Sequence, residues 1–124
     1  MYADEDRIDA AEQLAEHNPH GAAEALSAIA CDPSVGDEVR LSAAEQLAAL
    51  DPRAAGPACL AVACDGAVGD EVRLSAAEQL AAVDPRAAGP AYSAIARDGA
   101  VGDEVRLSAA EQLAAIGGAA GVPT

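Results

Sequence analysis

The chain repeats one phrase at a fixed interval. The segment DEVRLSAAEQLAA begins at Asp37 and returns at Asp70 and Asp103, each time 33 residues further on. A diverged copy begins at Asp4, where AEQLA recurs in register. Self-similarity at such a period is typical of arrays in which each unit packs on its neighbours. The sequence therefore predicts one repeat domain over 4–116, divided into units 4–36, 37–69 and 70–102 and a half unit 103–116. Residues 117–124 contain several Gly and a Pro and are predicted to form a flexible tail.

Each unit is predicted to hold two helices. Apolar residues recur at helical spacing after Asp37 and mark one buried face, made of Val39, Ala43, Leu47 and Leu50. Asp51 can cap the following helix, and Pro52 suits its first position, where the missing N–H costs nothing. That helix turns Cys59, Val62 and Ala63 inward. Within it, Gly56-Pro57 predicts either a kink or a helix that starts only at Pro57. No stretch alternates with period two, so we expect an all-α fold of about seven helices.

The order of residues within each unit resembles a known family. A Pro, an Asp and a Val-Arg pair follow one another as Pro57, Asp65 and Val72-Arg73, and again as Pro90, Asp98 and Val105-Arg106. This arrangement resembles the HEAT repeat, which places a Pro in its first helix, an Asp at the turn and Val-Arg early in its second helix. The resemblance covers 4–116, although Glu24 replaces the Pro in the first unit. It implies a right-handed α-solenoid of 33-residue two-helix units that begins and ends on a second-type helix.

The turn of this chain departs from the family pattern. The stretch DGAVGDEVR separates the turn Asp from the Val-Arg pair by more residues than the family has. In HEAT repeats the Asp and the Arg form hydrogen bonds that stack along the solenoid. The resemblance therefore leaves two alternatives open here: the Arg bonds to the turn Asp, or it bonds to the helix-start residues Asp70 and Asp103.

The net charge of the chain limits the classes of partner that it can bind. The chain has 21 acidic residues, seven basic residues and no Lys, which leaves a formal net charge of −14. Binding to nucleic acid requires cationic side chains that neutralise phosphates. We therefore expect neither nucleic acid nor a membrane as a partner. An acidic start without an apolar leader, together with three cysteines, an odd number, favours a cytoplasmic protein with free thiols.

The sequence offers no catalytic arrangement. His17 and His20 flank a turn without a neighbouring nucleophile that the pattern identifies. Together with Cys31 they lack the spacing of a metal site. We therefore expect no catalytic residue, no metal, no cofactor and no enzymatic activity.

Two features are candidates for a partner-binding surface. Leu41, Leu74 and Leu107 form a column on the side of the second helices away from the buried face. They can contact the adjacent second helix, or they can form a shallow apolar groove.

The second feature is a short stretch that varies between near-identical units. Units 37–69 and 70–102 differ at five of 33 positions, and four of these lie between residues 92 and 97 of the later unit. Packing drift explains its inward positions, and Tyr92 and Arg97 are where a contact is first expected.

These observations favour a non-catalytic interaction or scaffold module that binds a protein or peptide through its surface. One alternative is a sequestering protein that binds a small molecule in an apolar groove. Another is a regulatory accessory domain or an acidic mimic, because the helix-start Asp and the Glu of AEQLA form charged columns. Self-association through uncapped solenoid ends is also open.

Overall fold

In the part of the chain that the structure describes, seven helices follow one another without a strand. The computed structural model describes residues 4–119, and all its regular structure is α-helical within that range. Each helix packs against the next one along the chain. This confirms the predicted all-α fold. The helices are α1 (Asp4–Ala15), α2 (Pro19–Ala30), α3 (Asp37–Leu50), α4 (Pro52–Ala63), α5 (Asp70–Val83), α6 (Pro85–Arg97) and α7 (Asp103–Ala119).

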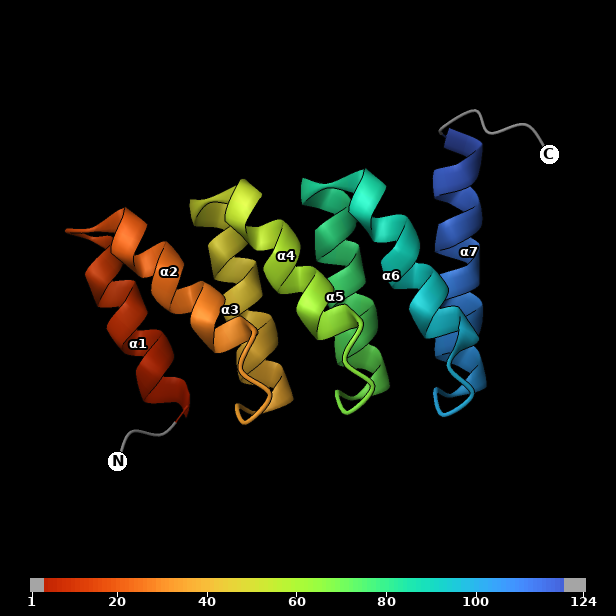
Figure 1. The fold of residues 1–124 in the computed structure, drawn as a ribbon, viewed down its shortest axis with the longest axis horizontal. Helices are drawn as coiled ribbons and strands as arrows, with labels where there is room; N and C mark the ends of the chain where they lie inside the picture. Colours follow the sequence, from red (N-terminus) through yellow and green to blue (C-terminus); the bar gives the residue numbers. More distant parts are fainter. Residues whose placement is uncertain (1–3, 120–124) are drawn as a thin grey trace.

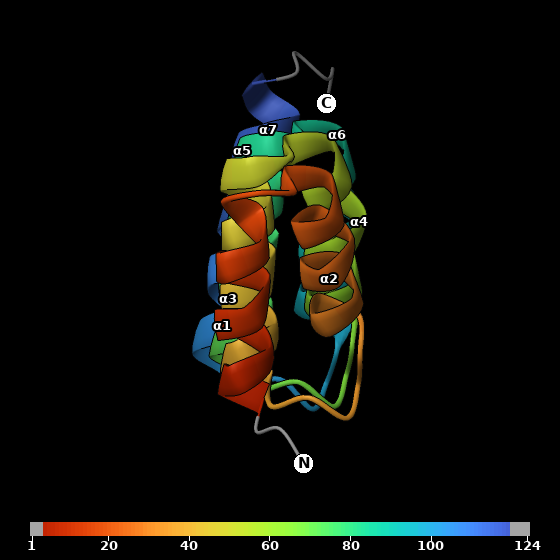
Figure 2. The same cartoon turned by 90° about the vertical axis from the view of Figure 1, so that its left-hand side faces the viewer.

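The helices form two layers that run the length of the molecule (Figures 1 and 2). One layer holds α1, α3, α5 and α7 and is called the odd layer below; the other holds α2, α4 and α6 and is called the even layer. The described chain begins at one end of this row and ends at the other (Figure 1). Both ends of the row are therefore odd-layer helices, and the odd layer has one helix more than the even layer.

Side-chain caps and prolines mark the starts of the even-layer helices, as the sequence predicts for Asp51 and Pro52. The Asn18 side chain accepts a hydrogen bond from the Gly21 N–H at 2.9 Å, and Asp51 accepts one from the Ala54 N–H at 3.4 Å. Each even-layer helix begins with a Pro. These contacts satisfy N–H groups that the first helical turn leaves without a partner.

Two expectations about helix limits need correction. Helix α4 begins at Pro52 and runs through Pro57, so the alternative start at Pro57 is wrong. The fully buried Ala55, Ala58 and Cys59 hold this part of the helix against its neighbours, which offsets the hydrogen bond that Pro57 removes. Helix α7 continues to Ala119, three residues beyond the expected end of the last half unit. The rest of the expected tail, residues 120–124, lies outside the described residues.

The core is built from small side chains repeated along the row. In α3 the side chains of Ala43, Ala44 and Leu47 are fully buried, and in α4 so are Cys59, Val62 and Ala63. Val39 and Leu50 are half-buried against this core, so the predicted inward faces of both helices are confirmed. A buried Val anchors each turn from an even to an odd helix; these are Val35, Val68 and Val101.

Candidate interaction surfaces

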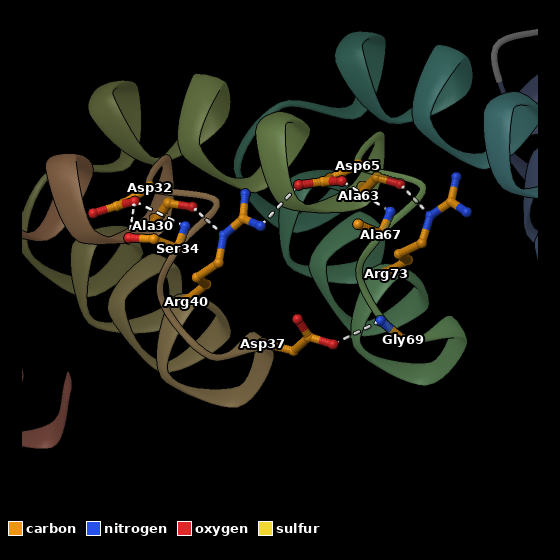
Figure 3. A network of polar contacts seen from close by, with 10 residues as sticks. All are labelled: Ala30, Asp32, Ser34, Asp37, Arg40, Ala63, Asp65, Ala67, Gly69 and Arg73. Carbon is orange, nitrogen blue, oxygen red and sulfur yellow. Dashed lines mark hydrogen bonds and ion pairs between the residues drawn. The ribbon is translucent and has the colours of Figure 1, made fainter. Parts of the chain in front are cut away.

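A ladder of Arg and Asp side chains joins successive units (Figure 3). The Arg40 guanidinium donates to the Ala30 carbonyl at the end of α2, at 2.9 Å, and to Asp65 in the next turn, also at 2.9 Å. The same contacts recur 33 residues on, where Arg73 donates to Ala63 and Asp98. Of the two alternatives that the sequence leaves open, the Arg pairs with the turn Asp of its own unit, while its bond to the Ala carbonyl reaches the preceding unit.

Each turn Asp also organises its own turn. One oxygen of Asp65 accepts the Ala67 N–H at 2.9 Å while the other accepts from Arg40. The Arg40 guanidinium, and after it the Ala67 N–H, hold the pKa of the Asp65 carboxyl below its ordinary value. Asp98 has a lowered pKa for the corresponding reasons. The carboxylates are thus held ionised, and each one couples its turn to the preceding odd-layer helix.

The helix-start Asp residues form a second ladder along one edge of the row. Asp37 accepts the Gly69 N–H at 2.8 Å, and Asp70 accepts the Gly102 N–H at the same distance (Figure 3 shows the first). These bonds join the start of one odd-layer helix to the turn that precedes the next odd-layer helix. In the interior of the row, the turn Asp residues and the helix-start Asp residues therefore both have a structural role.

The Arg ladder changes at its last member. Arg106 donates through Nε to the Ala96 carbonyl at 3.0 Å, as Arg40 and Arg73 do to theirs. Within residues 4–119, however, no later turn follows that could supply an Asp. Arg106 is half-buried, whereas Arg40 and Arg73 are each 3% exposed.

Charge is divided unequally between the two layers. Of the 21 acidic residues, five lie in α1 and three in each of α3, α5 and α7. The even-layer helices contain one, Glu24, together with Arg53, Arg86 and Arg97. The other four Arg residues are the ladder residues, which start at Arg7. The odd layer is therefore strongly acidic and the even layer weakly basic.

A groove crosses the acidic edge of the molecule between two odd-layer helices. It lies between the first turns of α5 and α7 and is lined by Gly69, Asp70, Glu71, Val72, Gly102, Asp103, Glu104 and Val105. Asp70 is engaged with Gly102, whereas Glu71 and Glu104 are exposed. The groove therefore combines Gly and Val residues with carboxylates from both helices.

The exposure of the side chains in the Leu column changes along the row of helices. Ile8 in α1, which holds the same place, is 8% exposed, and Leu41 and Leu74 are half-buried against the core. Leu107 is 61% exposed. Since α3 contacts α5 and α5 contacts α7, the column is covered wherever a further odd-layer helix follows. Leu107 is the one member that offers a large apolar surface.

The variable stretch in α6 separates into a buried and an exposed part. Tyr92 is 1% exposed and is among the largest fully buried side chains. It therefore belongs to the core, which corrects the expectation that it offers a contact to a partner. Arg97 is exposed in the last turn of α6, where the helix dipole favours a cation. Of this pair, Arg97 alone stays in the candidate surface.

The remaining reactive side chains are scattered. His20 Nε2 lies 3.6 Å from Glu24 Oε1, and both side chains are largely exposed. Burial raises the pKa of the Cys59 thiol to about 11, and the Glu45 carboxylate adds to this shift. Cys31 and Cys64 are exposed, and none of the three cysteines is in a disulfide. Among residues 4–119 no group of His, Cys, Asp and Glu could hold a metal ion, and no helix there is long and apolar enough to cross a membrane.

Comparison with protein-family models, with curated proteins and with solved structures finds no match to this chain.

Proposed function

We propose that this chain is a right-handed, HEAT-like α-solenoid that acts as a non-catalytic interaction module. Its partner is a protein or peptide with a basic surface, bound along the odd layer. The repeating Arg and Asp contacts along the row of helices support the solenoid, because they recur at the 33-residue period of the sequence. Solenoids present extended surfaces for binding, and their units rarely carry chemistry.

The observation that carries the proposal is the division of charge between the layers. Four of the seven Arg residues are engaged in the ladder that links the units. They therefore leave the outward carboxylates of the odd layer largely unbalanced. Glu12, Glu45, Glu78 and Glu111 are exposed and hold the same place on successive odd-layer helices. A basic segment that crosses these helices meets a carboxylate at every step, which favours both fast association and specificity for charge.

The test compares two variants that lose the same charge from different faces. The first carries Glu45→Gln, Glu78→Gln and Glu111→Gln on the odd layer. The control carries Glu16→Gln, Glu24→Gln and Asp84→Asn, which are exposed and lie outside the odd-layer helices. Binding of an Arg- and Lys-rich peptide is measured by calorimetry at low and high salt.

We expect the odd-layer variant to weaken binding about tenfold, since three exposed ion pairs at about 0.5 kcal/mol each amount to one decade of affinity. The control should bind almost as tightly as the wild type. Added salt should weaken the wild-type complex, because exposed charges are screened. Equal loss in both variants would show that net charge alone matters, and affinity indifferent to salt would refute a basic partner.

A further inference from the structure

Helix α1 is a weakened copy of the other odd-layer helices. It has 12 residues where α3 and α5 have 14, and Asp6 and Asp9 replace the Val and Ser that the other three share. Its ladder contact, from Arg7 to Asp32, measures 3.3 Å, compared with 2.9 Å for Arg40 to Asp65. The Arg7 side chain is 35% exposed, whereas that of Arg40 is 4% exposed. Helix α1 therefore fills the first place of the odd layer with a poorer set of contacts.

Helix α7 carries the full set of contact residues, but several of them are exposed to solvent. Its first 13 residues are identical to those of α3 and α5. Ala77 and Leu80 of α5 are 0% exposed, yet their equivalents in α7, Ala110 and Leu113, are exposed and half-buried. The difference arises because α6 and its turn cover this face of α5, and within residues 4–119 nothing covers it on α7.

We propose that α7 of one copy can replace α1 of a second copy, so that α1 is a built-in cap that limits head-to-tail assembly of this chain. In the assembled form α7 lies against α2 and α3 of the next copy, as α3 lies against α4 and α5 within one chain. Arg106 then donates to the next copy's Asp32, in the manner of Arg40 and Asp65. Leu107 and Ala110 take the places that Ile8 and Ala11 hold, which are 8% and 2% exposed.

The order of the helices explains why α1 must leave. Both ends of the described row are odd-layer helices, α1 and α7 (Figure 1). Two intact copies placed end to end would bring α7 against α1 and leave the even layer one helix short between them. Once α1 is displaced, α2 to α7 make three complete even–odd pairs, and the next copy continues the pattern without a gap. Helix α6 of one copy then lies beside α2 of the next, as α2 lies beside α4.

The test mixes one variant of this chain with the wild-type chain, so that the two can pair in only one way. The acceptor carries Ile8→Asp and Ala11→Asp, which unseat α1, and Leu107→Asp, which blocks its own α7. The donor is the wild-type chain. Each should be monomeric alone, and an equimolar mixture should give a complex with the mass of two chains by size-exclusion chromatography with light scattering.

Two controls locate the contact. A donor with Leu107→Asp should lose the complex, and a donor with Arg106→Ala should weaken it at least tenfold. That loss should disappear when the acceptor also carries Asp32→Asn, because the two substitutions remove the same bond. An excess of a peptide of residues 1–18 should dissociate the complex, because it competes for the place of α1.

Circular dichroism decides whether the acceptor is folded. If Ile8→Asp and Ala11→Asp unfold it, Arg7→Ala with Leu107→Asp provides a milder acceptor, because Arg7 is a partly exposed contact. A folded acceptor that stays monomeric in the mixture overturns the proposal. A complex that persists with the Leu107→Asp donor overturns it as well.

Discussion

The same substitution at three equivalent positions separates the contribution of the stacking from that of the local sequence. Leu47, Leu80 and Leu113 lie in identical 13-residue segments. The first two are 0% exposed, and Leu113 is half-buried because nothing among the described residues covers its side of α7. Truncating a buried Leu to Ala costs about 3 kcal/mol from lost burial and the cavity that remains. At the half-buried position most of the cavity term is absent, and the cost falls to about 1 kcal/mol.

Urea unfolding followed by circular dichroism measures these differences directly. Leu47→Ala and Leu80→Ala should lower the free energy of unfolding by similar amounts, and Leu113→Ala by about a third as much, with the dependence on urea unchanged. In thermal unfolding, 3 kcal/mol corresponds to about 10 °C for a domain of this size. Equal losses at all three positions would refute the reasoning, because the local sequence would then account for the whole effect.

Three further predictions concern single side chains. The native pKa of Asp65 lies below the ordinary 3.8. Its stabilising contribution is therefore present above pH 3.8 and is lost as the pH falls through the native pKa. The free energies of unfolding of the wild type and Asp65→Asn should therefore converge in acid, and a constant difference between them would contradict this. At pH 8 a thiol reagent should modify Cys31 readily and Cys59 only on unfolding, since Cys59 is buried with a pKa of about 11; mass spectrometry of the labelled peptides tests the order. Arg97→Ala should change stability by less than about 0.5 kcal/mol, and a larger loss in urea would show that this exposed residue is structural.

Features encoded by neighbouring residues were predictable from the sequence. The helix start at Asp37, the cap at Asp51 and the first position of Pro52 follow from the chemistry of helix ends, and all three are as expected. The inward face that includes Leu47 and Cys59 follows from periodicity. The division of charge between the two layers is also visible in the sequence, since the odd-layer segment DEVRLSAAEQLAA is acidic and the even-layer segment PRAAGPACLAVA is not.

Features that depend on contacts between helices were not predictable in this way. Arg40 and Asp65 are 25 residues apart, and their pairing follows from how the turn after α4 lies beside the first turn of α3. Leu41 and Leu107 have the same neighbours in sequence but different exposure, because within residues 4–119 a further odd-layer helix follows Leu41 and none follows Leu107. Helical periodicity places Tyr92 on the inward side of its helix, and the structure buries it there, so only the partner contact expected of Tyr92 is wrong. The local sequence pattern thus predicts where each helix lies, but it does not predict which copy of a repeated side chain is exposed to solvent.

The most direct test of the proposed interaction module maps a bound basic peptide onto the two layers by nuclear magnetic resonance. The account predicts that amide resonances shift along the outward side of α3, α5 and α7, around Glu45, Glu78 and Glu111, and that those of α4 and α6 stay in place. Shifts confined to the even layer, or no saturable shift at low salt, would contradict it.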